Sequence, residues 1–342
     1  MKDLTRLIEE SAAKLFESLG QSDNIELMES GTFPLACWEA FKEDGWLQTM
    51  LSEDQGGAGL GLAGGCVLMR LAGYYSVPLP VVESLLGIYL LAESGELPND
   101  NLYVPALLNT ADEKTIYIQG VPWARHADGV VVVFAGEEGC QLQLVKRTDY
   151  QLFEGSNMAG EPRDDISFDS ALLMNARSIV SLSIKTVESW LALARAAQMS
   201  GALQSVFERT VEYANERSQF GRQIGKFQAV QQQIAVQAEL TSAAMCATDA
   251  AMLHIETEQE WECIVGAKIA AGEAAGVSAK TAHAVHAAIG FTHEYPLQLS
   301  TRRLWSWRDE YGHEAYWAKQ LGAYFMQSGT TNLWSNLTQQ TA

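Results

Sequence analysis

The hydrophobic pattern changes its period twice along the chain, and this double change limits the possible folds more than any other feature. Up to about residue 98, apolar residues recur at the spacing of amphipathic helices. Between about residues 101 and 179 they form short runs rich in valine, isoleucine and aromatic residues, which are typical of strands. The helical spacing then returns. The sequence therefore predicts a mainly α-helical protein with a small β domain: an N-terminal helical domain (1–102), a reduced β domain (103–179) and a C-terminal four-helix bundle (180–342).

The N-terminal domain is predicted to contain a helix along the apolar stripe from Leu4 to Leu19 and three more, over Leu35–Glu43, Leu62–Gly73 and Val82–Ala92. Before the third of these helices lies a glycine-rich segment, Gly56–Gly61. Four glycines in six residues indicate a loop with positive φ angles or close backbone approach, and on spacing alone it is interpreted as a connector between helices.

Predicted strands cover Thr115–Gln119, Gly129–Phe134, Gln141–Val145 and Asp165–Phe168. The second contains four consecutive valines, and such a run indicates a strand buried on both faces. The C-terminal domain is predicted to contain helices over Ser181–Glu216, Phe227–Glu256, Glu258–Ile289 and His313–Gln327. The third is rich in alanine, which lets helix axes approach closely in an antiparallel bundle.

Composition excludes several functions. The formal net charge is −19 and no run of lysine and arginine occurs, which argues against nucleic acids and anionic membranes as partners but not against a small anion held by a few arginines. No apolar run is long enough to span a membrane and no signal-peptide core is present, so a cytoplasmic protein is expected. The five scattered cysteines are interpreted as buried thiols in a reducing compartment.

The most informative segment is Tyr213–Ala235, which ends one helix, turns at two glycines and begins another. It places Arg217, Arg222 and Lys226 beside helix-terminal amides, an arrangement that can bind phosphate. On spacing alone, a polar turn between helices is the better explanation.

This segment resembles the signature of the acyl-CoA dehydrogenase family, Arg-x-Gln-Phe-Gly-x-x-Ile-x-x-Phe-Gln-x-x-Gln. The matching residues are Arg217, Gln219, Phe220, Gly221, Ile224, Phe227, Gln228 and Gln231. Two other segments, Trp38–Leu60 and Gly290–Arg303, also resemble the family, and so does the helix–β–helix order.

The resemblance implies FAD bound between subunits, with the flavin ring against one subunit's β domain and the pyrophosphate and adenosine against the neighbour's bundle. By position in the motifs, the cofactor-binding residues would be Arg217, Gln219, Phe220, Gln228 and His286, with Arg217 pairing with the pyrophosphate. In the family, a carboxylate removes the α-proton of an acyl-CoA while a hydride passes from the β-carbon to the flavin.

The sequence departs from the family at the residues that perform this reaction. The two positions at which the family places its glutamate base correspond to Tyr311 and Leu191, so no catalytic residue is assigned. A tyrosine is protonated near neutral pH. Glu310 is adjacent, but an offset of one residue turns a helical side chain by about 100°, so it would replace the base only through a local bulge.

Two cofactor-contacting regions are also altered. The β domain is shorter than in the family and lacks its flavin-contacting strings. The family's Gln-x-His-Gly-Gly string becomes Ala284–Ala288, which keeps His286 but places β-carbons where two glycines stood. Such β-carbons would crowd a pyrophosphate that approaches the backbone closely.

The prediction is a subunit of a heteromeric FAD-dependent acyl-CoA dehydrogenase that supplies the phosphate and adenosine half of the FAD site. A catalytic partner subunit, in a heterotetramer with this chain, would supply the base and the flavin pocket. By resemblance, the substrate would be the CoA thioester of a steroid side chain and the electron acceptor an electron-transferring flavoprotein. The alternatives are a self-sufficient homo-oligomeric dehydrogenase that uses Glu310 and a cofactor-free structural paralogue.

Two further groups have simpler explanations. His283 and His286 lie three residues apart on one predicted helix but have no acidic ligand nearby, so no metal site is predicted. Arg302, Arg303 and Arg308 surround two tryptophans and can hold an anion or stack on a ring, and a solvated interface patch is an equal alternative.

Overall fold

The computed structural model describes residues 2–96, 99–109 and 113–327. The N-terminal part is helical, as predicted. Its helices are α1 (Lys2–Leu19), α2 (Ser22–Glu29), α3 (Leu35–Glu43), α4 (Gly61–Tyr74) and α5 (Val81–Glu93). Helix α2 was not predicted, because it is short and buries only Ile25 and Met28, which are too few apolar positions to show a helical period.

The glycine-rich segment is the connector between α3 and α4, as predicted. It contains two 3₁₀ turns, η1 (Trp46–Gln48) and η2 (Glu53–Gln55), and the second is closed by a capping box between Ser52 and Gln55. Gly56 follows with a φ of +84°, a conformation that glycine adopts without strain.

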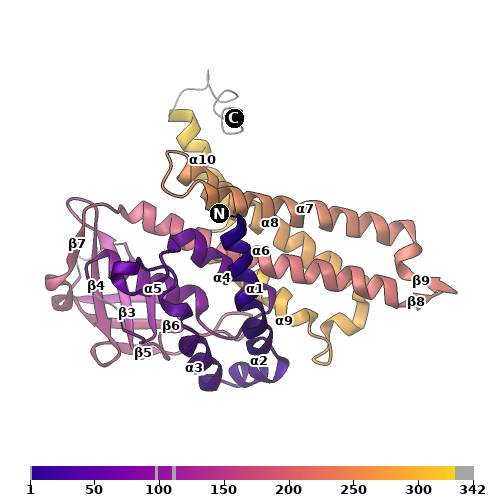
Figure 1. Ribbon diagram of the computed structural model, residues 1–342, viewed down its shortest axis with the longest axis horizontal. Helices are drawn as coiled ribbons and strands as arrows, with labels where there is room; N and C mark the ends of the chain where they lie inside the picture. The colour runs from indigo at the N-terminus through magenta and orange to yellow at the C-terminus, as the bar shows by residue number, and fades with distance from the viewer. Residues whose placement is uncertain (1, 97–98, 110–112, 328–342) are drawn as a thin grey trace.

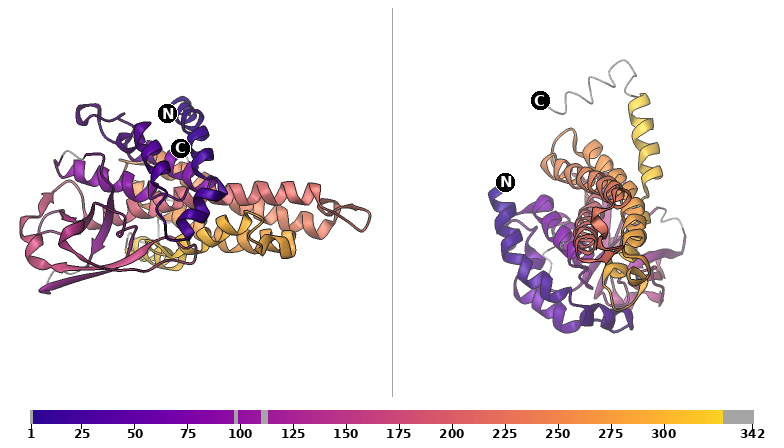
Figure 2. Two further views of the ribbon diagram at one scale, coloured as in Figure 1. Left: turned by 90° about the horizontal axis from the view of Figure 1, so that it is seen from below. Right: turned by 90° about the vertical axis from the view of Figure 1, so that its right-hand side faces the viewer.

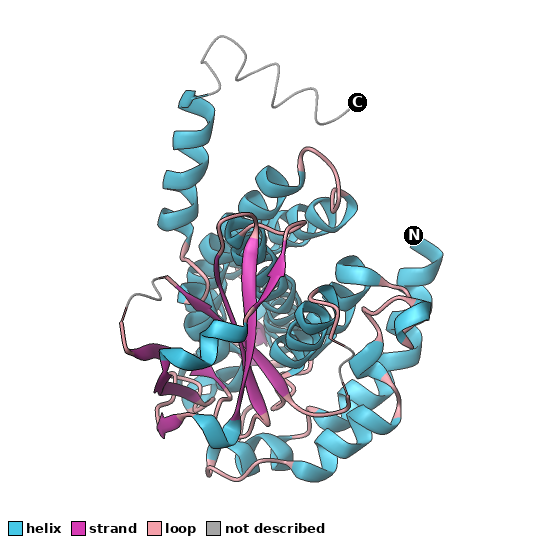
Figure 3. Cartoon of the chain, turned by 90° about the vertical axis from the view of Figure 1, so that its left-hand side faces the viewer, coloured by secondary structure: helices cyan, strands magenta, loops and turns pink. Residues whose placement is uncertain are grey.

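The β domain consists of two sheets, drawn in magenta in Figure 3. The larger has the order β1 (Tyr103–Leu108), β3 (Gly129–Ala135), β4 (Cys140–Lys146), β7 (Arg177–Ile179), with β1 parallel to β3 and the other pairs antiparallel. The smaller antiparallel sheet has the order β2 (Thr115–Pro122), β6 (Arg163–Asp169), β5 (Gln151–Phe153). Val130–Val133 are completely buried, as their unbroken apolarity predicts. The short strands β5 and β7 and the proline-containing β1 were not predicted.

The C-terminal part contains α6 (Ile184–Glu216), α7 (Gln228–Leu253), α8 (Glu260–His286), α9 (Leu297–Asp309) and α10 (Glu314–Gln327). A small hairpin, β8 (Ser218–Gln219) and β9 (Arg222–Gln223), followed by the turn η5 (Ile224–Lys226), joins α6 to α7. Helix α9 was missed because its buried face includes Ser300, Thr301 and Arg303, which interrupt the apolar stripe.

The long helix α6 runs through the molecule and packs on α4, α7, α8 and α9. Figure 1 shows the β domain at one end of the molecule and the β8–β9 hairpin at the opposite end of the bundle. Both views in Figure 2 agree that α6, α7 and α8 run side by side, and the view from below shows them projecting beyond the N-terminal helices. The bundle therefore presents one end far from the chain's own β domain.

The cysteines differ in their exposure to solvent. The expectation of buried thiols is correct for Cys37, Cys66 and Cys140, but Cys246 is exposed and Cys263 is half-buried. Cys246 lies on α7, which buries only one narrow stripe of residues, so much of that helix faces solvent. Within the residues described, no helix is both long enough and apolar enough to cross a membrane.

Candidate functional site

The signature segment forms one wall of a cavity of about 510 Å³ at the free end of the bundle. Four of the five predicted cofactor-binding residues line this cavity: Arg217, Gln219, Phe220 and His286. The fifth, Gln228, is the exposed first residue of α7 and is not among the lining residues. Arg217, Gln219, Phe220 and His286 therefore meet in space around one cavity.

The hairpin that presents these side chains is a tight two-residue turn. Gln219 pairs with Arg222, and the two residues between them, Phe220 and Gly221, both have positive φ angles, of +52° and +80°. This is the pattern of a type I′ turn, whose twist matches that of a β-hairpin. The turn leaves the Phe220 side chain 91 % exposed at the mouth of the cavity.

Arg217 is the C-cap of α6 and is exposed to solvent. Its backbone anchors the turn, because its amide donates to the carbonyl of Tyr213 and its carbonyl accepts from the amide of Ile224. Its guanidinium makes no ion pair or hydrogen bond with any other residue in the described ranges. A cation without an internal partner at the mouth of a cavity can bind an anionic ligand.

His286 forms the inner wall of the cavity and is 1 % exposed. Its Nδ1 lies 2.7 Å from the carbonyl of Ala282, so Nδ1 carries the proton, and its Nε2 lies 3.2 Å from the hydroxyl of Tyr295. The ring stacks on Tyr213 at a centroid distance of 4.3 Å. Burial lowers the pKa of His286, so the imidazole is neutral at physiological pH and acts as a polar wall rather than as a cation.

Ala287 and Ala288 line the cavity beside His286. Ala287 ends α8 with a φ of +55° and a ψ of −139°, a conformation that L-residues rarely adopt and glycine adopts freely. The backbone thus takes a glycine-like path although the residue is alanine. The cavity offers a free cation, an apolar wall and a neutral imidazole, which fit a phosphate joined to a ring system, but its β-carbons narrow the approach to the backbone.

Neither position that corresponds to the family's base carries an acid. Leu191 is buried inside α6. Tyr311 has a φ of +54°, and its hydroxyl is buried with no hydrogen-bond partner in the described part of the chain. Burial is the main reason that the pKa of Tyr311 is raised, so this hydroxyl keeps its proton.

Glu310 is held in ion pairs. Helix α9 ends before it, and its backbone is extended. One carboxylate oxygen accepts from Nε of Arg163 at 2.8 Å, and the other lies 2.7 Å from the guanidinium of Arg195. Both oxygens of this carboxylate face arginines inside the protein, so this geometry does not favour the alternative in which Glu310 serves as the base.

The arginines of α9 each lie against a carboxylate, which does not favour the alternative in which they hold an anion. Arg302 pairs with Glu29 at 2.6 Å, Arg303 lies 3.2 Å from a carboxylate oxygen of Glu161, and Arg308 pairs with Glu314. The guanidinium over Trp307 belongs to Arg195 on α6. The sequence did not indicate these pairings because the acidic partners Glu29 and Glu161 lie far away in the chain.

The two histidines of α8 have internal partners. His283 places Nε2 at 2.9 Å from Oγ1 of Thr301 and stacks on Phe291. No group of three or more histidine, cysteine, aspartate or glutamate side chains in the described residues is arranged to hold a metal ion.

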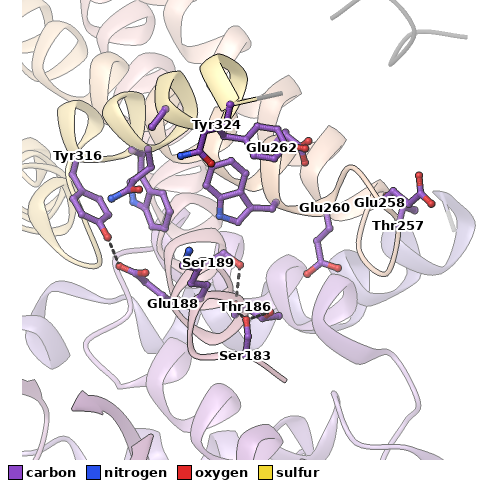
Figure 4. A pocket seen from close by; sticks show the side chains of 16 residues that line it. Ser183, Thr186, Glu188, Ser189, Thr257, Glu258, Glu260, Glu262, Tyr316 and Tyr324 are labelled. Atoms are coloured by element: carbon purple, nitrogen blue, oxygen red, sulfur yellow. Dashed lines mark hydrogen bonds between the residues drawn. The ribbon is translucent and has the colours of Figure 1, made fainter. Parts of the chain in front are cut away.

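A second cavity, of about 610 Å³, lies between the start of α6, the start of α8 and α10 (Figure 4). Four glutamates, Glu188, Glu258, Glu260 and Glu262, line it together with aromatic side chains. Glu188 accepts from the Tyr316 hydroxyl at 2.8 Å, and Glu260 accepts from Nε1 of Trp190 at 2.7 Å. This cavity was not predicted, because three segments that are far apart in the sequence form it.

Two family models match the chain. The N-terminal domain of acyl-CoA dehydrogenases matches residues 3–110, and their C-terminal domain matches residues 186–308. The second match spans the signature, the cavity and the buried Arg195.

Curated relatives lead to the same family. The acyl-CoA dehydrogenase IpdE2 of Mycobacterium tuberculosis is 28 % identical over 256 residues, which cover 74 % of this chain and 75 % of that protein. IpdE2 of Mycolicibacterium smegmatis is 25 % identical over 308 residues, or 89 % of this chain and 93 % of that protein. The short/branched chain specific acyl-CoA dehydrogenase of Rattus norvegicus is 35 % identical, but only over 30 % of this chain and 24 % of that protein.

Solved structures share the fold. A structure described as the Tcur3481-Tcur3483 steroid ACAD G363A variant superposes with a TM-score of 0.85 at 21 % identity, covering 96 % of this chain and 99 % of that one. The ChsE4-ChsE5 complex from Mycobacterium tuberculosis has a TM-score of 0.84 at 18 % identity, covering 94 % and 97 %. With two family models that together match most of its length, the chain belongs to the acyl-CoA dehydrogenase family, whose members are FAD-binding oxidoreductases.

Proposed function

We propose that this chain is the non-catalytic subunit of a heteromeric FAD-dependent acyl-CoA dehydrogenase. The observation that carries the proposal is the place of the signature cavity. Its lining includes the β8–β9 hairpin, which Figure 1 shows at the end of the bundle opposite to the chain's own β domain, and the 33-residue helix α6 that leads to it is about 50 Å long. A ligand bound there needs a second chain to hold its other end.

In this proposal Arg217 pairs with the FAD pyrophosphate, since its guanidinium has no partner among the residues that the structure describes. Gln219 and the exposed Phe220 contact the same cofactor at the mouth of the cavity, and His286 forms its polar inner wall. Gln228 lies just beyond, at the start of α7, and contacts FAD from the rim. When bound, FAD supplies the acceptor for the hydride that leaves the β-carbon of the acyl-CoA.

The partner supplies the base and the flavin pocket. Tyr311 and Leu191 offer no carboxylate, and Glu310 is engaged by Arg163 and Arg195. The steroid ACAD and the ChsE4-ChsE5 complex among the similar folds support a two-chain enzyme that acts on the CoA thioester of a steroid side chain. A heterotetramer and an electron-transferring flavoprotein as acceptor complete the proposal.

The test compares flavin content in two preparations. The chain is purified alone and also co-purified with a homologue from the same genome that retains the glutamate base. We expect visible flavin absorbance only in the complex. Arg217→Ala should weaken FAD binding by the complex about tenfold or more, since it removes a charge-assisted contact. The matched control is Arg177→Ala on β7, an arginine that is half exposed and remote from the cavity, which should leave flavin content unchanged.

Stoichiometric flavin in the chain alone, with activity lost in Glu310→Gln, would establish the self-sufficient enzyme instead. A complex whose flavin content is insensitive to Arg217→Ala would favour the cofactor-free paralogue. The substrate class is tested on the reconstituted complex: oxidation of straight-chain acyl-CoAs with no turnover of steroid thioesters would refute it.

A further inference from the structure

A cluster of buried charges lies at the centre of the molecule, away from the signature cavity. It consists of three carboxylates and three guanidinium groups: Glu83, Glu161, Glu310, Arg163, Arg195 and Arg303. We call this set the central ion cluster. Its members come from the N-terminal helices (α5), from the β domain (β6 and the segment before it) and from the C-terminal part (α6, α9 and the C-cap of α9). One charge-balanced network thus joins all three parts of the chain.

Arg195 is the centre of the cluster and is 1 % exposed. Its Nη2 lies 2.6 Å from a carboxylate oxygen of Glu83 and 2.7 Å from one of Glu310, and its Nη1 contacts the side-chain oxygen of Gln198. The guanidinium also lies between two aromatic rings, 5.7 Å from the centroid of Trp307 and 5.5 Å from that of Tyr311. The group is thereby enclosed by acids and rings from α5, α9 and the segment that follows α9.

The position of this guanidinium matters because both base positions border it. Tyr311 is in direct contact with it, and Leu191 lies one helical turn before Arg195 on the same face of α6. A base at either position would have to reach the same substrate carbon, so the space that both positions face is where a substrate would lie. Leu191, Arg195 and Tyr311 line neither the signature cavity nor the cavity beside α10.

The cluster depends on every member. Glu83 is 2 % exposed, and Arg195 is its only partner among the described residues. Loss of one member of a buried ion pair leaves an uncompensated charge in a medium of low dielectric constant, which is far more damaging than loss of both. Glu161, in turn, is shared by Arg163, Arg303 and the Nε1 of Trp307 at 2.9 Å.

We propose that the central ion cluster, with Arg195 at its centre, fills this chain's own reaction site and holds the three parts of the chain together around it. The guanidinium occupies the space that a substrate and a base would share, so this chain binds no acyl group there. This inference concerns a different place from the proposed FAD half-site, and its test does not depend on flavin.

The first experiment measures thermal unfolding of the full chain in a double-mutant cycle. We expect Arg195→Met to lower Tm by more than about 5 °C, because it leaves the buried carboxylate of Glu83 without its cationic partner. Glu83→Gln should lower it too, and the double variant should lose much less than the sum of the two single losses. The matched control is the pair Arg308→Met and Glu314→Gln at the partly exposed end of α9, where each shift should stay within about 2 °C. An Arg195→Met shift no larger than that of the control would overturn the proposal that the cluster holds the three parts together.

The second experiment tests by chemical rescue whether the guanidinium fills this site. Arg195→Ala empties a guanidinium-shaped space lined by Glu83, Glu310 and Gln198. We expect millimolar N-methylguanidinium chloride to raise the Tm of this variant by several degrees but not that of the wild type or of Arg308→Ala. If Arg195→Ala does not fold, Arg195→Met combined with Glu83→Gln serves as the folded reference, and Arg195→Ala is then refolded with and without the probe. A variant whose stability and refolded yield are both insensitive to N-methylguanidinium would overturn the proposal that Arg195 fills this site.

Discussion

Single residues with unusual backbone angles lie at the functional positions of this chain. Non-glycine residues with positive φ are rare in proteins. In the described ranges, two of them, Phe220 and Ala287, line the signature cavity, and a third, Tyr311, stands at the family's base position. Such strain persists only where the surrounding structure enforces it, which ties these backbone paths to the sites they form.

Relief of strain at Ala287 gives the first prediction. Ala287→Gly removes a β-carbon from a backbone with φ of +55° and ψ of −139°, which glycine adopts at no steric cost. We expect the free energy of unfolding to rise by about 1 kcal/mol, measured by urea denaturation. The control is Ala288→Gly, next in the same 3₁₀ turn but without a positive φ, which should lower stability by about 0.5–1 kcal/mol. Equal effects of the two substitutions would contradict the strain argument.

The sequence predicts a site residue when its partners are close to it in the chain, and fails to do so when they are far apart. Arg217, Gln219 and Phe220 are contiguous in one motif, so a resemblance located them, and His286 was placed by a second motif. Arg195 and Glu83 are 112 positions apart, and no local pattern links a buried arginine to its acid. The φ of Ala287 was equally hidden, because alanine in a sequence predicts the opposite conformation.

At the scale of elements, the crossing of α4 and α6 is set by two glycines. A β-carbon at Gly73 would lie 1.8 Å from the carbonyl oxygen of Gln198, and one at Gly201 would lie 1.9 Å from the carbonyl oxygen of Arg70. Each glycine thus lets the other helix's backbone approach. Since α6 carries Arg195 and ends at Arg217, this close contact fixes the helix on which both sites depend.

Helix packing gives the second prediction. Gly201→Ala should lower the free energy of unfolding by about 2–4 kcal/mol, because the methyl group meets backbone that cannot move aside. Gly266→Ala on α8 is the control: a β-carbon there meets nothing within 4 Å, so it should raise stability by about 0.5–1 kcal/mol through helix propensity. Urea denaturation of both variants measures the difference. A Gly201→Ala variant as stable as the wild type would show that the two helices can separate.

Elements were predicted from sequence wherever their buried face was apolar. Helices α3, α4 and α5 show regular apolar spacing and were placed within a residue or two. Helix α9 was not predicted, because its buried face includes Arg303. The predicted end of α8 lay beyond its real end at His286, because Ala287 and Ala288 have a high helix propensity. Both errors occur where contacts with distant parts of the chain decide the conformation: Arg303 forms a buried ion pair, and Ala287 and Ala288 form a cavity wall.

At the scale of the whole molecule, the central ion cluster couples stability to pH. Burial alone would raise the pKa of Glu161, but Arg163, Arg303 and Arg195 lower it to about 2. An unfolded glutamate has a pKa of about 4.3. Because the folded-state pKa is the lower one, the stabilisation is fully present above about pH 4.5 and is lost as the pH falls toward 2. The loss amounts to roughly 3 kcal/mol, at about 1.4 kcal/mol for each pKa unit.

Glu161→Gln should therefore lower the free energy of unfolding and also change how it varies with pH. At pH 6 the variant should be less stable than the wild type, since Arg163 and Arg303 lose their shared anion. As the pH falls from 5 to 3 the wild type should lose stability while Glu161→Gln changes less, so the gap narrows. The control is Glu154→Gln, 71 % exposed, whose profile should run parallel to that of the wild type. Urea unfolding at each pH measures the difference in the free energy of unfolding between the wild type and Glu161→Gln. A difference that stays constant down to pH 3 would mean that protonation of Glu161 is not what weakens its ion pairs with Arg163 on β6 and Arg303 on α9.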